Sequence, residues 1–107
     1  MQFRPDAGET VTKDQSNDAE GSGTTIASGT ITTTGDDEIA IGGYGEYVGN
    51  TSSAHQINGV NATAVVQAGT FGLNFTAMWY RILTATFAGG QATCTNSSGD
   101  WLGAIIT

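Results

Sequence analysis

The sequence has very few positive charges. It contains three Lys and Arg residues against ten Asp and Glu, which gives a formal net charge of −7. Nucleic-acid binding needs clustered Lys or Arg to neutralise phosphates, so no nucleic-acid partner is expected. Attachment to an anionic membrane needs the same clusters and is not expected either. No apolar run approaches the roughly 18 residues of a membrane-spanning helix. The sequence therefore predicts a soluble protein without nucleic-acid or membrane partners.

The marks of a disulfide-bonded secreted domain are also missing. The chain has one cysteine, Cys94, which excludes an internal disulfide framework. Because Cys94 lies between two threonines in a β-like stretch, we expect it to be a small core residue. The first ten residues, MQFRPDAGET, contain no apolar core of a signal peptide. We expect a chain that is made soluble inside a cell, or one that is a mature or excised piece.

Small polar residues take the place of charge. Only 12% of the residues are charged, whereas 17 Thr, 7 Ser and 16 Gly are present. Threonine is β-branched and favours strands, and glycine permits tight turns. At 107 residues the chain predicts one all-β domain. Disorder is the alternative, but apolar clusters at 39–41, 78–83 and 101–106 argue against it.

Alternating patterns and turn residues predict about eight short strands and no helix. Residues 24–34 and 38–44 flank the TGDD turn and predict a β-hairpin. Residues 54–58 and 61–67 flank Gly59, as two short strands or as one strand with a bulge.

Two late segments are the most apolar. Residues 73–87 predict the strongest strand, with a break near Thr84, because fifteen residues is long for one strand. A helix is the rival interpretation, and the threonines and aromatics of this segment favour the strand. Residues 101–107 are apolar on both faces, so we expect them in the middle of a sheet or against a partner.

These segments predict an antiparallel β-sandwich of jelly-roll or Greek-key type. Residues 1–22 are polar and acidic and are interpreted as an irregular N-terminal arm, and residues 23–107 as the sandwich domain. The expected core consists of Ile31, Ile39, Ile41, Val65, Phe75, Met78, Tyr80, Ile82, Trp101, Ala104 and Ile105.

No residue pattern predicts catalysis or a cofactor. His55 is the only histidine, and nothing around it resembles a nucleophile elbow or an oxyanion turn. Asp36, Asp37 and Glu38 offer oxygen ligands for an ion, but their spacing does not match a calcium loop. A solvated acidic turn is the favoured interpretation. We expect no catalytic, cofactor or metal site, and the protein is predicted not to be an enzyme.

Exposed aromatic side chains could stack on sugars. Tyr44 and Tyr47, in the glycine-rich stretch GGYGEYVGN, are the candidates, whereas Trp79 and Trp101 lie in apolar segments that favour core packing. Four N-x-S/T triplets could carry glycans if the source glycosylates its proteins. They begin at Asn50, Asn61, Asn74 and Asn96.

Two segments resemble a known family. KDQSNDAEGSGTTIASGTITTTGDDEIAIGGYG and AMWYRILTATFAGGQATCTNSSGDWLGAII are similar to a β-sandwich module of tailed-phage virion proteins, which form capsid decorations or tails. The shared motifs are D-Q-S, a Thr-rich strand leading into D-E-ϕ-x-I-G (ϕ apolar), and a closing S-S-x-D-W. The resemblance covers residues 13–48 and 77–106. It implies structural roles for Ile39, Ile41 and Trp101 and brings no catalytic residue.

The resemblance implies a virion structural protein, first a capsid decoration subunit, otherwise a tail or fibre component. Expected partners are further copies of the chain, the major capsid protein or other virion proteins, because such modules expose strand edges that invite pairing. The expected location is the virion, assembled in the host cytoplasm. One alternative is an extracellular filament or fibre subunit that polymerises by strand donation. Another is a carbohydrate-binding module with a glycan contact through Tyr44 and Tyr47.

Overall fold

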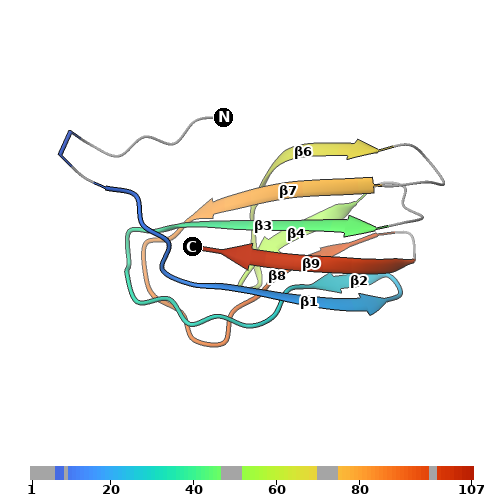
Figure 1. Cartoon of the computed structure of the whole chain (residues 1–107), viewed down its shortest axis with the longest axis horizontal. Coiled ribbons are helices and arrows are strands. Elements are labelled where there is room, and N and C mark those ends of the chain that lie inside the picture. The colour runs from blue at the N-terminus through green and yellow to red at the C-terminus, as the bar shows by residue number, and fades with distance from the viewer. Residues whose placement is uncertain (1–6, 9, 47–51, 70–74, 97–98) are drawn as a thin grey trace.

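Two antiparallel sheets face each other in the computed structural model, which describes residues 7–8, 10–46, 52–69, 75–96 and 99–107 (Figure 1). No helix occurs in these residues. The predicted all-β antiparallel sandwich is confirmed, and the narrower choice between jelly roll and Greek key stays a prediction. The nine strands are β1 (Ser16–Ser22), β2 (Thr25–Ala27), β3 (Ile39–Glu46), β4 (Ser53–Ile57), β5 (Val60–Asn61), β6 (Thr63–Gly69), β7 (Phe75–Ile82), β8 (Ala92–Thr95) and β9 (Asp100–Ile106).

The five-stranded sheet has the order β1-β9-β3-β7-β6, and the four-stranded sheet has the order β2-β8-β4-β5. The central placement of β9 confirms the expectation for the apolar C-terminal segment. Residues 16–22, which the sequence interpretation assigned to the arm, pair with β9 from end to end as an edge strand. The described part of the chain contains no helix that is long and apolar enough to cross a membrane.

The predicted hairpin across the TGDD turn is wrong. β2 pairs with β8 in the four-stranded sheet, whereas β3 pairs with β7 and β9 in the other. The segment between them crosses from one sheet to the other, and Asp14 fixes it by accepting hydrogen bonds from the N–H and hydroxyl of Thr34 at 2.8 and 2.7 Å. These bonds hold the pKa of Asp14 below its usual value. The acidic turn is therefore part of a crossover.

Of two other strand predictions, that for residues 73–87 is confirmed and that around Gly59 is confirmed in part, because residues 61–67 are divided between β5 and β6 in different sheets. β4 and β5 pair on either side of Asn58 and Gly59, whose φ angles of 51° and 71° are both positive. Positive φ at both central residues is the conformation for which Asn-Gly is preferred in two-residue hairpins. β7 is a strand that ends at Ile82, and the chain bends at Thr84 as expected.

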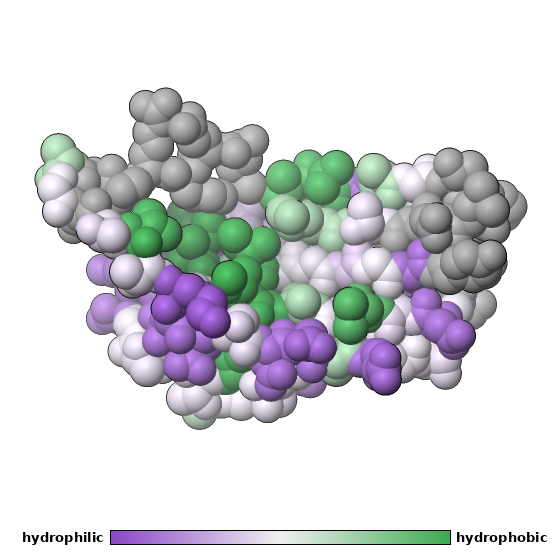
Figure 2. All heavy atoms as spheres, viewed as in Figure 1, coloured by the Kyte–Doolittle hydropathy of each residue, from purple (hydrophilic) through white to green (hydrophobic). Residues whose placement is uncertain are grey.

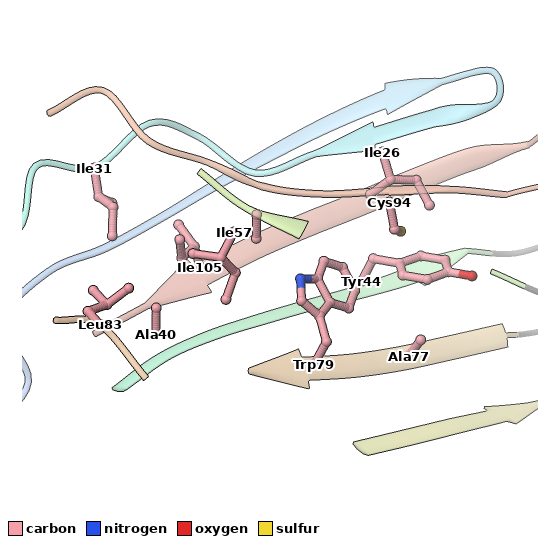
Figure 3. Packing of buried hydrophobic residues seen from close by; sticks show 11 residues of the cluster. Ile26, Ile31, Ala40, Tyr44, Ile57, Ala77, Trp79, Leu83, Cys94 and Ile105 are labelled. Carbon is pink, nitrogen blue, oxygen red and sulfur yellow. The ribbon is translucent and has the colours of Figure 1, made fainter. Parts of the chain in front are cut away.

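The core lies between the sheets (Figure 3) and contains Ile26, Ile31, Ala40, Tyr44, Ile57, Ala77, Trp79, Leu83, Ala92, Cys94 and Ile105. Of the predicted core, Ile31 and Ile105 are confirmed as buried. Ile39, Ile41, Tyr80 and Trp101 are half-buried, and Trp101 packs against the core. The prediction is wrong for four residues, which are exposed, and the side chain of Phe75 lies outside the described residues. The four exposed residues are Val65, Met78, Ile82 and Ala104.

For β7 the core prediction chose the wrong face of the strand. Trp79 is fully buried, and its indole N–H donates to the Gln56 carbonyl at 3.0 Å. Arg81 shares this inner face, where its Nη1 donates to the Ile57 carbonyl at 3.3 Å. A long Arg side chain can lie along apolar surface while its charged end reaches polar atoms. The core prediction placed the opposite face, with Met78 and Ile82, inward, whereas the structure leaves both side chains exposed.

Candidate interaction surface

The outer face of the five-stranded sheet is apolar along its central strands. Residues directly opposite each other on neighbouring strands share a face. Ile41 of β3 lies between Ile106 and Tyr80, and Ile39 lies opposite Ile82. We call this surface the outer face. In the following rows it contains Gly43 between Ala104 and Met78, and Gly45 between Leu102 and Thr76.

Several large side chains of the outer face are exposed to solvent. Ile82 is 62% exposed, Leu102 52% and Met78 45%. Figure 2 shows hydrophobic atoms gathered over the ends of β3, β7 and β9 near the exit of the arm. Single exposed apolar residues are ordinary, but a contiguous apolar patch on a soluble protein marks an interaction site. The outer face is therefore the strongest candidate for a functional surface.

A hollow of about 310 Å³ lies in the middle of the outer face. It exists because Gly43 has no side chain: a Cβ placed there would meet only the Ala77 carbonyl oxygen, at 3.5 Å. Neighbouring apolar side chains form its walls, and polar residues of β1 form one side. The lining residues are Ser16, Asn17, Asp18, Ile41, Gly42, Gly43, Met78, Ala104, Ile105 and Ile106.

Carboxylates border the outer face on the side of β1. Asp18 and Glu20 lie opposite Ala104 and Leu102, and Asp100 begins β9 on the same face. Of the described cations, Arg81 belongs to the inner face, and Lys13 lies beyond the start of β1 with its Nζ 3.2 Å from the Ser16 hydroxyl. The surface thus combines an apolar centre with an acidic border, visible as the hydrophilic lower margin in Figure 2.

The opposite edge of this sheet is unlike β1. All seven residues of β6 are exposed, and none carries a charge. The four-stranded sheet packs over β9, β3 and β7, so β6 extends beyond its cover. A bulge between Ala64 and Val66 is the one irregularity in its pairing with β7. An edge strand without charges can accept a further strand.

A group of buried polar side chains lies at the end of the sandwich where β3 finishes. The Ser52 hydroxyl lies 2.7 Å from Nε2 of His55, whose ring is 5.0 Å from that of Trp79. Burial lowers the pKa of His55, so the ring stays neutral to lower pH. Among the described residues no carboxylate bonds to the His55 ring, so the pair lacks the third group of a nucleophilic triad. Sequence analysis missed this pair, for which only the short spacing of 52 and 55 was a signal.

Glu46 is the one buried acid of this group. Its carboxylate accepts a hydrogen bond from the Asn96 side-chain amide, and both side chains are buried. The second oxygen of Glu46 has no hydrogen-bond partner among the described residues. Burial, with Glu46 as a second cause, raises the pKa of Cys94 to about 12, which confirms Cys94 as an unreactive core residue.

The structure separates the sugar-stacking candidates. Tyr44 is only 4% exposed and packs 6.3 Å from Trp79, ring centre to ring centre, so its ring is not open to a sugar. Burial raises the pKa of Tyr44 to about 12. Tyr47 lies outside the described residues. Trp79 is a core residue, as expected.

The asparagines of the glycosylation triplets also differ in their exposure to solvent. The Asn96 side chain is buried against Glu46 and closed to a glycan in the folded protein, whereas Asn61 is exposed. Asn50 and Asn74 lie outside the described residues.

The acidic turn shows no converging ligands. Asp36 and Asp37 are exposed, and one oxygen of Glu38 accepts the N–H of Gly35 at 2.7 Å. In the part of the chain that the structure describes, no three His, Cys, Asp or Glu side chains come together as a metal site would require.

The fold and the surface together define a class: a small all-β sandwich that leaves the apolar outer face of one sheet uncovered. Comparison of the chain with known protein families, with curated proteins and with solved structures finds no match. The resemblance to tailed-phage modules remains a prediction from the sequence motifs, and the function has to be argued from the surface itself.

Proposed function

We propose that this protein is a structural subunit of a tailed-phage virion, in the first place a capsid decoration subunit that binds the capsid lattice. The apolar outer face of the five-stranded sheet carries this proposal. Burying apolar surface is worth about 25 cal/mol per Å², so an uncovered sheet face favours association with another protein. The sequence motifs shared with virion modules indicate which kind of assembly that protein belongs to.

The mechanism is passive. The outer face supplies the buried contact, and the carboxylates of Asp18, Glu20 and Asp100 select a partner surface with basic residues at its rim, because like charges would repel. Each contact need not be tight. On a symmetric lattice many weak contacts act together, so attachment can exceed the affinity of a single one by orders of magnitude. The partners are the major capsid protein, other virion proteins or further copies.

The proposal is tested on phage particles that encode the protein. Purified particles are stripped of the subunit, rebound with recombinant protein, and the occupancy is measured by electron microscopy. Ile82→Asp places a charge on the outer face and should abolish rebinding. Val60→Asp is the matched control, because Val60 is a similarly exposed side chain of the other sheet. Absence of the protein from particles, or full rebinding of Ile82→Asp, would contradict the proposal.

The uncharged edge of β6 favours a second candidate function, an extracellular filament subunit that polymerises by strand donation. A strand from a neighbouring subunit would pair with the open backbone of β6. Head-to-tail contacts of this kind do not close and generate threads. Negative-stain images of concentrated protein separate the two functions: threads would support the filament, and particle-bound subunits without threads would support the decoration protein.

A further inference from the structure

Because residues 16–22 form β1, the arm is redefined as residues 1–13. We propose that the arm of a second copy of this chain docks on the outer face, with its Val11 side chain seated in the hollow at Gly43. This inference rests on the proposed function, because it names one neighbour of the assembled subunit and the residue with which that neighbour binds. It goes further because it names both the binding pocket, the hollow at Gly43, and the anchor residue that fills it, Val11, within the same sequence.

The side chain of Val11 is as exposed as an interface residue is expected to be before its partner binds. It is 71% exposed, more than any other large apolar side chain in the described part of the chain. The residues around it, 10–13, are exposed and belong to neither sheet. In Figure 1 this part of the chain leaves the body beyond the start of β1 and turns away from it. Among the described residues, nothing covers the Val11 side chain.

The hollow has the size and lining for such an anchor. At about 310 Å³ it lies at the lower end of the range for ligand pockets, so it suits a side chain better than a large ligand. Ile41, Met78, Ala104 and Ile106 offer apolar contacts around the floor at Gly43. Anchors of this kind, one apolar side chain in a preformed pocket, carry much of the energy of protein interfaces.

Charge favours the arm over the acidic parts of a second copy. Residues 14–107 contain eight acids and one cation, whereas residues 1–13 contain two of each. Two bodies would repel across the acidic border formed by Asp18 and Glu20. The arm has no net charge and can cross that border without this cost. It combines this balance of charge with the most exposed large apolar side chain of the described residues, Val11.

The position of the arm makes an exchange geometrically simple. Ser16, Asn17 and Asp18 of β1 line the hollow, and the arm leaves the body only a few residues before them. Each arm therefore starts beside the hollow of its own chain, and an arm that reaches the partner's hollow brings the partner's arm near its own hollow.

The experiment measures self-association of the full chain by sedimentation over a wide range of concentration. Val11→Asp and Gly43→Leu should each weaken association by about tenfold or more, because each removes the burial of one valine. Val60→Asp is the matched control, because Val60 is an exposed apolar residue of the other sheet, and it should associate like the unmodified chain. Thermal unfolding of each monomer verifies that the variants fold.

A mixing experiment supplies the sharper result. Val11→Asp keeps the hollow and Gly43→Leu keeps the valine that fills it, so an equimolar mixture should form a heterodimer at concentrations where each variant alone does not associate. An unmodified chain that stays monomeric at all concentrations would overturn the inference, and so would a mixture that does not associate. If Val11→Asp leaves association unchanged while Ile82→Asp abolishes binding to particles, the arm inference fails and the proposed function stands.

Discussion

The inner and outer faces of the five-stranded sheet are made from the same strands, but the inner face is buried in the core and the outer face is exposed. Along β3 and β7 the inner face presents Ala40, Tyr44, Ala77 and Trp79, which are buried. The outer face of the same strands presents Ile39, Ile41, Met78, Tyr80 and Ile82, none of which is fully buried. The aliphatic side chains of these strands are thus concentrated on the face that the four-stranded sheet leaves uncovered. An ordinary sandwich places polar residues there, so the difference marks the outer face as a surface for assembly.

The comparison predicts its largest effect at Trp79 and Met78, neighbours on β7 that point to opposite faces. Trp79→Ala should lower the free energy of unfolding by about 3–5 kcal/mol, because it leaves a cavity between the sheets and the Gln56 carbonyl loses its donor. Met78→Ala should change it by less than about 1 kcal/mol in the monomer, as expected for a surface substitution. Urea unfolding of both variants at low protein concentration checks the contrast, and equal losses would contradict the assignment of faces.

Two adjacent glycines sharpen the same contrast. A Cβ at Gly42 would lie 2.6 Å from Nε1 of Trp79 and 2.6 Å from the Ala92 Cβ, whereas a Cβ at Gly43 fits without a clash. Gly42→Ala should therefore cost about 1–3 kcal/mol by overpacking. Gly43→Ala should be neutral or slightly stabilising, because it reduces the freedom of the unfolded chain. Thermal unfolding midpoints give the comparison directly, and a stable Gly42→Ala variant would show that Trp79 can move.

A smaller effect is expected at Ala54 in β4, one of the strands that cover the inner face. Its φ of 51° lies in the left-handed region, where a Cβ is strained. Ala54→Gly should raise the free energy of unfolding by less than about 1 kcal/mol, since relief of strain is partly offset by the greater freedom of glycine when unfolded. Self-association through the outer face should not change. A loss of stability in denaturant titrations would argue against strain at this position.

The smallest effect concerns pH and His55, which lies against Trp79. Its pKa in the folded protein is below the ordinary 6.5 because of burial. As pH falls through 6.5 the unfolded chain takes up this proton first, so stability decreases and levels off below the folded-state pKa. Stability measured on either side of pH 6.5 should show this decrease, and His55→Gln should remove it. A decrease of the same size in His55→Gln would assign it to other groups.

Much of the fold follows from local chemistry. Threonine-rich alternation predicts the β class, Gly59 predicts a break between two short strands or a bulge, and the apolar C-terminal segment predicts that β9 lies inside a sheet or against a partner. These predictions succeed because the preferences reside in a few neighbouring residues. The hairpin across 34–37 fails because Asp14, twenty residues away in sequence, binds Thr34 and fixes a crossover. Long-range contacts of this kind leave no local pattern.

The candidate surface was only partly predictable. The sequence indicated a need for partners from the resemblance and from the apolar character of 101–107, but it assigned Met78 and Ile82 to the core. Alternation divides a strand into two sets of side chains without saying which set faces inward. Arg81 gives no sign that it belongs to the inner face, because its polar contact with the Ile57 carbonyl exists only once β4 lies against β7. The hollow at Gly43 depends on three strands that are distant in sequence.

By itself the sequence determined that the chain forms antiparallel strands with tight turns and that it is strongly acidic. It also determined that the apolar segment 101–107 needs protein neighbours on both of its faces. Backbone propensity and composition act locally, and they suffice for these properties. Only the tertiary structure decided which face of β3, β7 and β9 is buried and which is offered to a partner. That choice depends on where the four-stranded sheet packs, and a sheet that is apolar on both faces carries no local signal for it.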